Sequence, residues 1–234
     1  MLRVNQLYGF GARRAAAGST DPYWANVTLL MGFEGADAST TFTDESASAN
    51  ACTAVGDAQI DTSFFKFGAS AGLLDGNDKV TVGIANDADF AFGTGDFSVE
   101  LWMRPQRTDG WILGCAENNT FTGWWMYYDA TTLNFRAIHP AGTLVSKTWS
   151  PSNGTWYFLQ AIRTSGTFEL AVDGVSLGTG AMADDIPCGQ SNGLALGSAG
   201  DYFGGNLIAS LDELRITKGV ARAIALPTAA FPRS

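Results

Sequence analysis

Residues 97–104 read FSVELWMR, and this stretch decides the fold. The odd-numbered residues are all apolar, whereas serine, glutamate and arginine occupy three of the even-numbered positions, with Trp102 as the fourth. Successive side chains of a β-strand point to opposite faces, so the alternation predicts a half-buried strand with the odd-numbered side chains in a core. Pro105 follows and is expected to end the strand, because proline has no N–H to donate.

Similar stretches lie on both sides of this strand. Strands are expected at residues 28–34, 111–115, 123–128, 133–138, 155–163, 168–172, 175–177, 193–197 and 207–217. Asp173-Gly174 lies between two of them and predicts a hairpin, because a type I′ turn needs positive φ at both central residues. The sequence thus predicts an all-β fold, a two-sheet antiparallel β-sandwich, with residues 21–234 as one domain.

The composition of the chain disfavours two classes of partner, nucleic acids and membranes. The chain has 234 residues, a formal net charge of −9 and a pI of about 4.4. This acidity disfavours nucleic acid as a partner, because a phosphate backbone would be repelled. No apolar run reaches the ~18 residues of a membrane span, so a membrane is not expected as a partner either. The first residues include arginines but no apolar stretch, so no signal peptide is predicted.

The three cysteines, Cys52, Cys115 and Cys188, are widely spaced. An odd number without close pairs predicts neither a disulfide framework nor a zinc site. We interpret them as small buried apolar residues of a protein assembled in a reducing cytoplasm.

Residues 1–20 differ from the rest, since they mix Gly, Ala and Arg without a sustained period. One interpretation is a tail without fixed structure. The other is a short extended N-terminal arm that docks on a partner, because free tails seldom carry this many large apolar groups. Its partner-binding residues would be Leu2, Val4, Leu7, Tyr8 and Phe10.

Four segments together resemble a known family. They are FGTGDFSVELWMRP (92–105), GTWYFLQAIR (154–163), FELAVDGV (168–175) and GNLIASLDELRITKGVAR (205–222). In this order and spacing they are similar to the laminin-G-like domain of the concanavalin A-like lectin/glucanase superfamily, which implies a jelly roll. Residues 21–35 (DPYWANVTLLMGFEG) and 211–222 (LDELRITKGVAR) resemble versions of this domain found in bacteriophage virion proteins.

Hydrolytic members of that superfamily carry two glutamates and an aspartate at alternate positions of one strand, so that the acid and the nucleophile face one glycosidic bond. This chain has no such motif. Asp212 and Glu213 are adjacent and would face opposite sides, and Glu100 stands alone on its strand. His139 lies beside a proline, which favours a loop, and no GxSxG elbow accompanies it. The chain is therefore not expected to be an enzyme.

A calcium ion is the cofactor that the resemblance implies. In similar domains the terminal strands lie side by side and often hold Ca²⁺, which here would use Glu34 and Asp212. Asp212 would share a strand face with Leu214 and Ile216, where a carboxylate must be paired. The alternative is that Asp212 accepts backbone N–H groups or pairs with Arg215 or Arg104.

Aromatic residues suggest a ligand-binding face. Trp102 turns away from the core, and residues 124–128 include four aromatic side chains. Large aromatics usually fill a core, which is our interpretation for Trp124. Lectins also stack such rings on sugars. Our ligand-binding candidates are Trp125, Tyr127, Asn118, Asn119 and Tyr202.

These observations favour a non-enzymatic bacteriophage structural protein, located in the virion as a capsid decoration or tail appendage. It would dock through its N-terminal arm onto capsid or tail proteins, form a homo-oligomer and adhere to host surface glycan. The alternative is a lectin-like carbohydrate-binding module.

Overall fold

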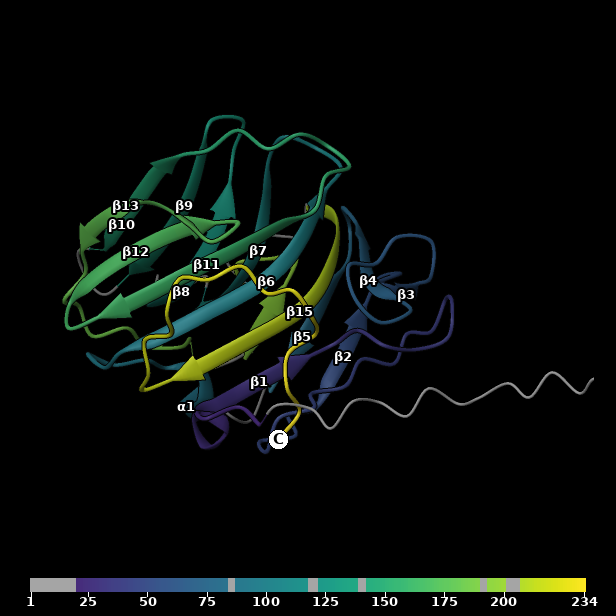
Figure 1. The fold of residues 1–234 in the computed structure, drawn as a ribbon, viewed down its shortest axis with the longest axis horizontal. Coiled ribbons are helices and arrows are strands. Elements are labelled where there is room, and N and C mark those ends of the chain that lie inside the picture. The colour runs from purple at the N-terminus through teal and green to yellow at the C-terminus, as the bar shows by residue number, and fades with distance from the viewer. Residues whose placement is uncertain (1–19, 84–86, 118–121, 139–141, 190–192, 201–206) are drawn as a thin grey trace, which may run out of the picture.

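The computed structural model describes residues 20–83, 87–117, 122–138, 142–189, 193–200 and 207–234. These residues form two antiparallel sheets packed as a sandwich, which confirms the predicted fold class (Figure 1). The helical elements of the described chain are η1 (Trp24–Asn26) and α1 (Asp87–Phe90).

The first sheet has eight strands. They are β1 (Val27–Met31), β3 (Gln59–Asp61), β4 (Ala71–Asp75), β6 (Phe97–Pro105), β11 (Tyr157–Thr164), β12 (Thr167–Val172), β13 (Val175–Ala181) and β15 (Ile208–Lys218). Their order is β13-β12-β11-β6-β15-β4-β3, and β1 pairs with the second half of β15. The predicted neighbourhood of the first and last strands is thereby confirmed.

The second sheet has seven strands. They are β2 (Cys52–Val55), β5 (Lys79–Val82), β7 (Gly110–Glu117), β8 (Thr122–Tyr128), β9 (Thr132–Ile138), β10 (Thr143–Thr148) and β14 (Leu194–Leu196). Their order is β10-β9-β8-β7-β14-β5-β2, so β2 is an edge strand that pairs with β5 alone among the described strands. Four of the strands, β2 to β5, lie between residues 35 and 96, where the sequence indicated none.

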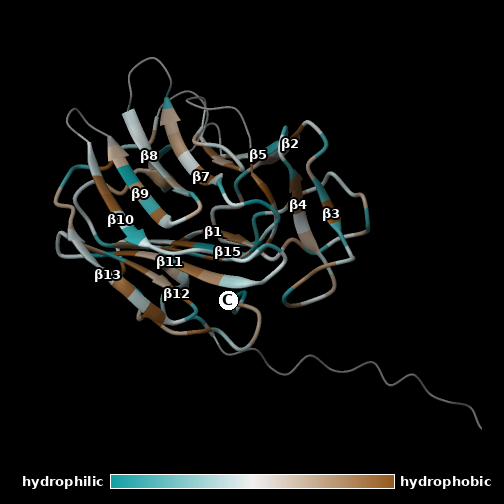
Figure 2. Ribbon diagram, turned by 90° about the horizontal axis from the view of Figure 1, so that it is seen from above, coloured by the Kyte–Doolittle hydropathy of each residue, from teal (hydrophilic) through white to brown (hydrophobic). Residues whose placement is uncertain are grey.

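The core lies between the sheets, and Figure 2 shows apolar and polar residues alternating along strands such as β9. Phe97, Val99, Leu101 and Met103 of β6 are buried in this core, as predicted. The opposite face of β6 is buried too, with Ser98 fully enclosed and Glu100 3% exposed. The prediction of a half-buried strand was therefore wrong, because another part of the chain covers the outer face of the eight-stranded sheet.

That cover is the C-terminal strap, residues 219–234, which crosses β11, β6 and β15 (Figure 1, yellow). The strap replaces solvent as the partner of polar side chains. Ser98 Oγ accepts the N–H of Arg222 at 2.7 Å. Gln160 donates to the carbonyl of Ala223 and accepts the N–H of Ala225, both at 3.3 Å.

Beneath the strap lies a buried ion network. Arg215 bridges two carboxylates, with Nη1 3.0 Å from Asp21 Oδ2 and Nη2 2.7 Å from Glu100 Oε2. Arg222 contacts the same two acids, with Nη2 2.8 Å from Asp21. The Asp21 N–H also donates to the carbonyl of Ser234 at 2.7 Å, so residue 21 and the last residue lie together on this face.

A bulge in β15 overturns the expected placement of two acidic residues. The register with β6 shifts between Asp212 and Arg215, and Glu213 has a φ of 48°. Asp212 pairs with Trp102 on the outer face instead of sharing the core face with Leu214. Glu213 also reaches the strap, where it accepts the N–H of Phe231 at 2.7 Å. The two carboxylates therefore do not point to opposite faces.

The structure corrects the prediction for the cysteines as well. Cys115 of β7 and Cys188 form a disulfide, with Cα atoms 5.1 Å apart and a sequence separation of 73. Only the folded chain brings them within the bridging distance. Cys52 is the free cysteine, and burial together with nearby Asp44 raises its pKa to about 12, which keeps the thiol protonated.

Candidate functional site

The outer face of the seven-stranded sheet carries an aromatic cluster formed by Trp111, Trp125 and Tyr127. The last two are on β8, where they alternate with the core residues Trp124, Met126 and Tyr128. Trp111 of β7 is the cross-strand partner of Tyr127. The Trp111 ring centroid lies 4.9 Å from that of Tyr127 and 5.9 Å from that of Trp125. The three rings thus form one continuous surface.

The members of the cluster differ in exposure. Trp125 is 3% exposed, packed against Ala116 and Ala199, so it supports the cluster from below. Trp111 and Tyr127 are partly exposed and present ring surface outward. Trp111 was missed as a ligand candidate, although the β7–β8 pairing that places it opposite Tyr127 could have revealed it.

Polar side chains of β9 border the cluster. Arg136 pairs with Trp125 across the strands, and its guanidinium carbon lies 6.0 Å from the ring centroid. Its Nε is buried and has no hydrogen-bond partner within the described part of the chain. Burial raises the pKa of Tyr127, so its hydroxyl stays protonated at neutral pH. Aromatic faces beside hydroxyl and guanidinium donors suit a ligand with apolar patches and many oxygens, such as a sugar.

Trp124 lies in the main core, as predicted, with its Nε1 donating to the carbonyl of Phe90 at 2.9 Å. Trp102 is also buried, under the strap and Phe67, and does not form a sugar face. Asn118, Asn119 and Tyr202 fall in segments 118–121 and 201–206, outside the described residues.

The two predicted calcium ligands both contact the β3–β4 loop. Asp212 Oδ2 accepts the N–H groups of Lys66 and Phe67 at 2.8 and 3.0 Å, and Glu34 accepts the N–H of Ala69 at 3.2 Å. This is the arrangement of the alternative interpretation, with backbone donors around Asp212. A cation would find one uncommitted oxygen on Asp212, its buried Oδ1, so Ca²⁺ at these residues stays a prediction.

A different acidic group lies near the free edge of the sandwich. Carboxylate oxygens of Asp57, Asp75 and Asp78 approach within 4.8 Å of one another. Asp78 is the buried member, and its Oδ1 accepts the N–H groups of Asp75 and Gly76 at 2.9 and 3.0 Å. Burial raises the pKa of Asp78. The trio concentrates negative charge at the end of β2.

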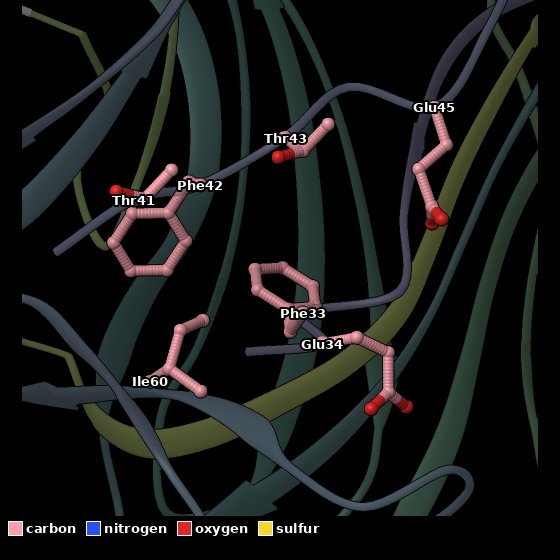
Figure 3. A pocket seen from close by; sticks show the side chains of 7 residues that line it. All are labelled: Phe33, Glu34, Thr41, Phe42, Thr43, Glu45 and Ile60. Atoms are coloured by element: carbon pink, nitrogen blue, oxygen red, sulfur yellow. The ribbon is translucent and has the colours of Figure 1, made fainter. Parts of the chain in front are cut away.

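A small pocket of about 130 Å³ opens beside the end of β1 (Figure 3). The rings of Phe33 and Phe42 form its apolar wall, with centroids 6.2 Å apart. Glu34 and Glu45 flank it, but both are engaged, Glu34 with Ala69 and Glu45 with the N–H of Gly32 at 3.0 Å. The two carboxylates thus accept backbone N–H groups, and Glu45 also lies 3.2 Å from Arg233 Nη2.

Within the described residues, no helix has the length and apolar character that crossing a membrane requires.

Several solved structures share this fold. The binding domain of Paraclostridial Mosquitocidal Protein 1 superimposes with a TM-score of 0.67 at 14% identity, covering 86% of this chain and 50% of that one. The receptor binding domain of botulinum neurotoxin C/D mosaic serotype gives 0.65 at 15%, covering 85% and 49%. The binding domain of botulinum neurotoxin DC in complex with SialylT gives 0.60 at 16%, covering 85% and 49%. The chain spans about half the length of each, and at these identities the likeness establishes the fold alone.

No curated protein sequence matches the chain. A family model does, described as concanavalin A-like lectin/glucanases superfamily, over residues 74–223. This range covers more than half of the chain, including the aromatic cluster and all but the first strands of the sandwich. The chain therefore belongs to the concanavalin A-like lectin/glucanase superfamily, in its laminin-G-like branch.

Proposed function

We propose that this protein is a non-enzymatic bacteriophage virion component that binds surface glycan through the aromatic cluster and is attached to the particle by its N-terminal residues. The observation that carries the proposal is the contrast between the two outer faces of the sandwich. The strap covers β11, β6 and β15 on the outer face of the eight-stranded sheet, whereas Trp111 and Tyr127 are partly exposed on the outer face of the other sheet.

The chemistry of the cluster favours a sugar. The C–H groups of a pyranose ring stack on indole and phenol faces, and its hydroxyls accept hydrogen bonds from donors at the edge. Here the protonated hydroxyl of Tyr127 and the guanidinium of Arg136, whose side chain is partly exposed, lie at that edge. A toxin binding domain of similar fold, about half of which this chain covers, was solved in complex with SialylT, so the first array includes sialylated glycans.

The position of the termini supports the attachment role. Asp21 and Ser234 meet on the face of the eight-stranded sheet, opposite the aromatic cluster. Residues 1–20, which include the expected partner-binding residues, therefore join the domain at Asp21, on the side away from the aromatic cluster. An anchor and a binding face placed back to back suit an appendage, and several copies on a particle would bind multivalently. The resemblance of residues 21–35 and 211–222 to phage virion domains agrees with this role.

The first test is glycan binding by the full chain. Trp111→Ala should weaken binding to the best glycan of an array about 10-fold, or about 1.4 kcal/mol, because one stacking face is lost. Phe64→Ala is the matched control, since Phe64 is exposed but lies on the β3–β4 loop. Equal binding by both variants would rule out the aromatic cluster as the site. Release of reducing ends would contradict the non-enzymatic role.

Attachment requires a second measurement. We expect the chain to remain with intact virus particles after a high-salt wash, as detected by mass spectrometry. The double variant Tyr8→Asp/Phe10→Asp should reduce its copy number at least ~10-fold, because the added carboxylates must be desolvated at the contact. Asn5→Asp adds charge at a polar position and serves as the control. Recovery of the unaltered chain only as free protein would contradict the virion role.

A further inference from the structure

A groove runs along the free edge of the seven-stranded sheet. One wall is formed by Thr40, Thr41 and Phe42, and the other by β2 with Gly56 after it, enclosing about 430 Å³. Cys52, Thr53 and Ala54 are the β2 residues that line it. The groove therefore lies where a further strand of this sheet would be.

The register of β2 shows which backbone groups face this groove. Gly83 N donates to the carbonyl of Ala51 at 3.0 Å, and Thr53 and Val55 pair opposite Thr81 and Lys79. Hydrogen-bonded and non-bonded pairs alternate in an antiparallel ladder. Thr53 and Val55 therefore bond to β5, while the N–H and C=O groups of Cys52 and Ala54 point into the groove.

These groups lack a partner across the groove. Within the described chain, no backbone hydrogen bond joins residues 40–43 to β2. Unpaired edges of this kind invite pairing with another extended segment, and proteins usually cover or charge them. An extended peptide satisfies such an edge through main-chain bonds and places alternate side chains against the neighbouring wall.

We propose that, in the free protein, the N-terminal segment Leu2–Phe10 of this chain adds to the open edge of β2 as a further strand. The sequence of the segment has the required pattern. Its even-numbered positions carry Leu2, Val4, Tyr8 and Phe10, and the alternation is interrupted at Gln6 and Leu7. In an extended strand these four apolar side chains would lie on one face, where Phe42 offers an apolar wall.

The distribution of charge along the chain also favours the N-terminal segment as the strand that fills this groove. Residues 1–19 contain three arginines and no acidic residue, so with a net charge of −9 for the whole chain the remainder carries −12. The acidic trio Asp57, Asp75 and Asp78 begins just after β2 ends. An antiparallel addition brings Arg3 to this end of the groove, where opposite charges within about a Debye length attract.

The segment is also long enough. Residues 11–19 would link it to the domain, and nine extended residues span up to about 30 Å. The start of β2 lies close to the start of β1, because Asn50 Nδ2 donates to the carbonyl of Thr28 at 3.0 Å, so the link has only part of the domain to cross. The inference goes beyond the proposed function, because it gives the attachment segment a docking site before assembly. Covering the edge would also suppress pairing between free copies.

Amide hydrogen exchange of the full chain tests the proposal residue by residue. In the unaltered protein, the amides of Cys52 and Ala54 should be protected to a degree similar to that of Thr53. Val4→Asp should accelerate exchange at Cys52 and Ala54 at least ~10-fold, because the segment leaves the edge. Asn5→Asp adds the same charge on the opposite side of the segment and should change these rates less than about threefold.

Thr53 provides an internal control, because its amide bonds to β5 whether or not the groove is filled. Its rate should remain the same in all three proteins, which shows that β2 itself is intact. Fast exchange at Cys52 and Ala54 in the unaltered chain would overturn the proposal, whatever the variants do. The measurement involves neither glycan nor virus particles, so its failure would leave the proposed function untouched.

Discussion

Replacing Arg215 by alanine is expected to lower the free energy of unfolding by about 3–5 kcal/mol. The side chain is buried between Asp21 and Glu100, which are themselves 1% and 4% exposed. Without Arg215, two buried carboxylates would share Arg222 alone, whose Nε lies 3.6 Å from Glu100. The loss also removes the guanidinium from the ring of Phe231, 3.8 Å away in the strap. Chemical denaturation at neutral pH measures the change.

Arg107→Ala is the matched control for this prediction. Arg107 also pairs with an aspartate, Asp109, at 2.9 Å, but both side chains are more than 40% exposed. An ion pair in solvent contributes about 0–1 kcal/mol, so this variant should unfold almost like the unaltered protein. Similar losses in both variants would show that burial beneath the strap does not strengthen the network.

Asp212→Asn is expected to stabilise the protein at pH 8 by about 2–4 kcal/mol. Burial raises the pKa of Asp212 to about 7, against the opposing effect of the N–H groups of Phe67 and Lys66. Between about pH 4 and pH 7 the unfolded chain has lost this proton while the folded chain keeps it, so stability falls as pH rises. Above pH 7 the folded protein holds a buried carboxylate, and asparagine removes that charge without changing the shape of the side chain.

Denaturation curves from pH 4 to pH 8 test this directly, because Asp212→Asn should lose the part of the pH dependence that lies between pH 4 and pH 7.

Asp129→Asn is a control for which the opposite change in stability is expected. The pKa of Asp129 is lowered, because hydrogen bonds from Thr131 and Thr132 outweigh the effect of desolvation. The ionised Asp129 carboxylate therefore stabilises the folded protein at pH values above the pKa that Asp129 has in the unfolded chain, and this stabilisation is lost as the pH falls. Asp129→Asn removes it, so this variant should be less stable than the unaltered protein at pH 8. Destabilisation by Asp212→Asn at pH 8 would show that the Asp212 carboxylate is favoured in the fold.

The Asp212 experiment also bears on the calcium prediction. A bound cation would hold the carboxylate in its charged form and reverse the expected sign. Adding Ca²⁺ should therefore leave the pH dependence unchanged if Asp212 serves only the backbone donors of the β3–β4 loop. A shift of the transition to lower pH would favour the cation.

Local pattern was sufficient for much of the fold. The alternation in residues 97–104 determined a strand and its core face, and Asp173-Gly174 determined the turn between β12 and β13, where φ is 52° and 75°. These features depend on neighbours in sequence, so they can be read without a model of the whole chain. The same alternation separated Trp124, in the core, from Trp125 and Tyr127 on the outer face.

Contacts between distant residues were decided only by the tertiary structure. Burial of Glu100 and Trp102 depends on a strap more than 100 residues later in the chain, and the Cys115–Cys188 disulfide spans 73 residues. The bulge at Glu213 shifts the register between β15 and β6. Whether a strand contains such an extra residue depends on its pairing with the neighbouring strand, so the alternation of apolar and polar residues could not predict it. Trp111 joined the candidate site only through its pairing with Tyr127. The sequence alone determined which faces the strands present, whereas the packing of distant segments decided which of those faces remains open to a ligand.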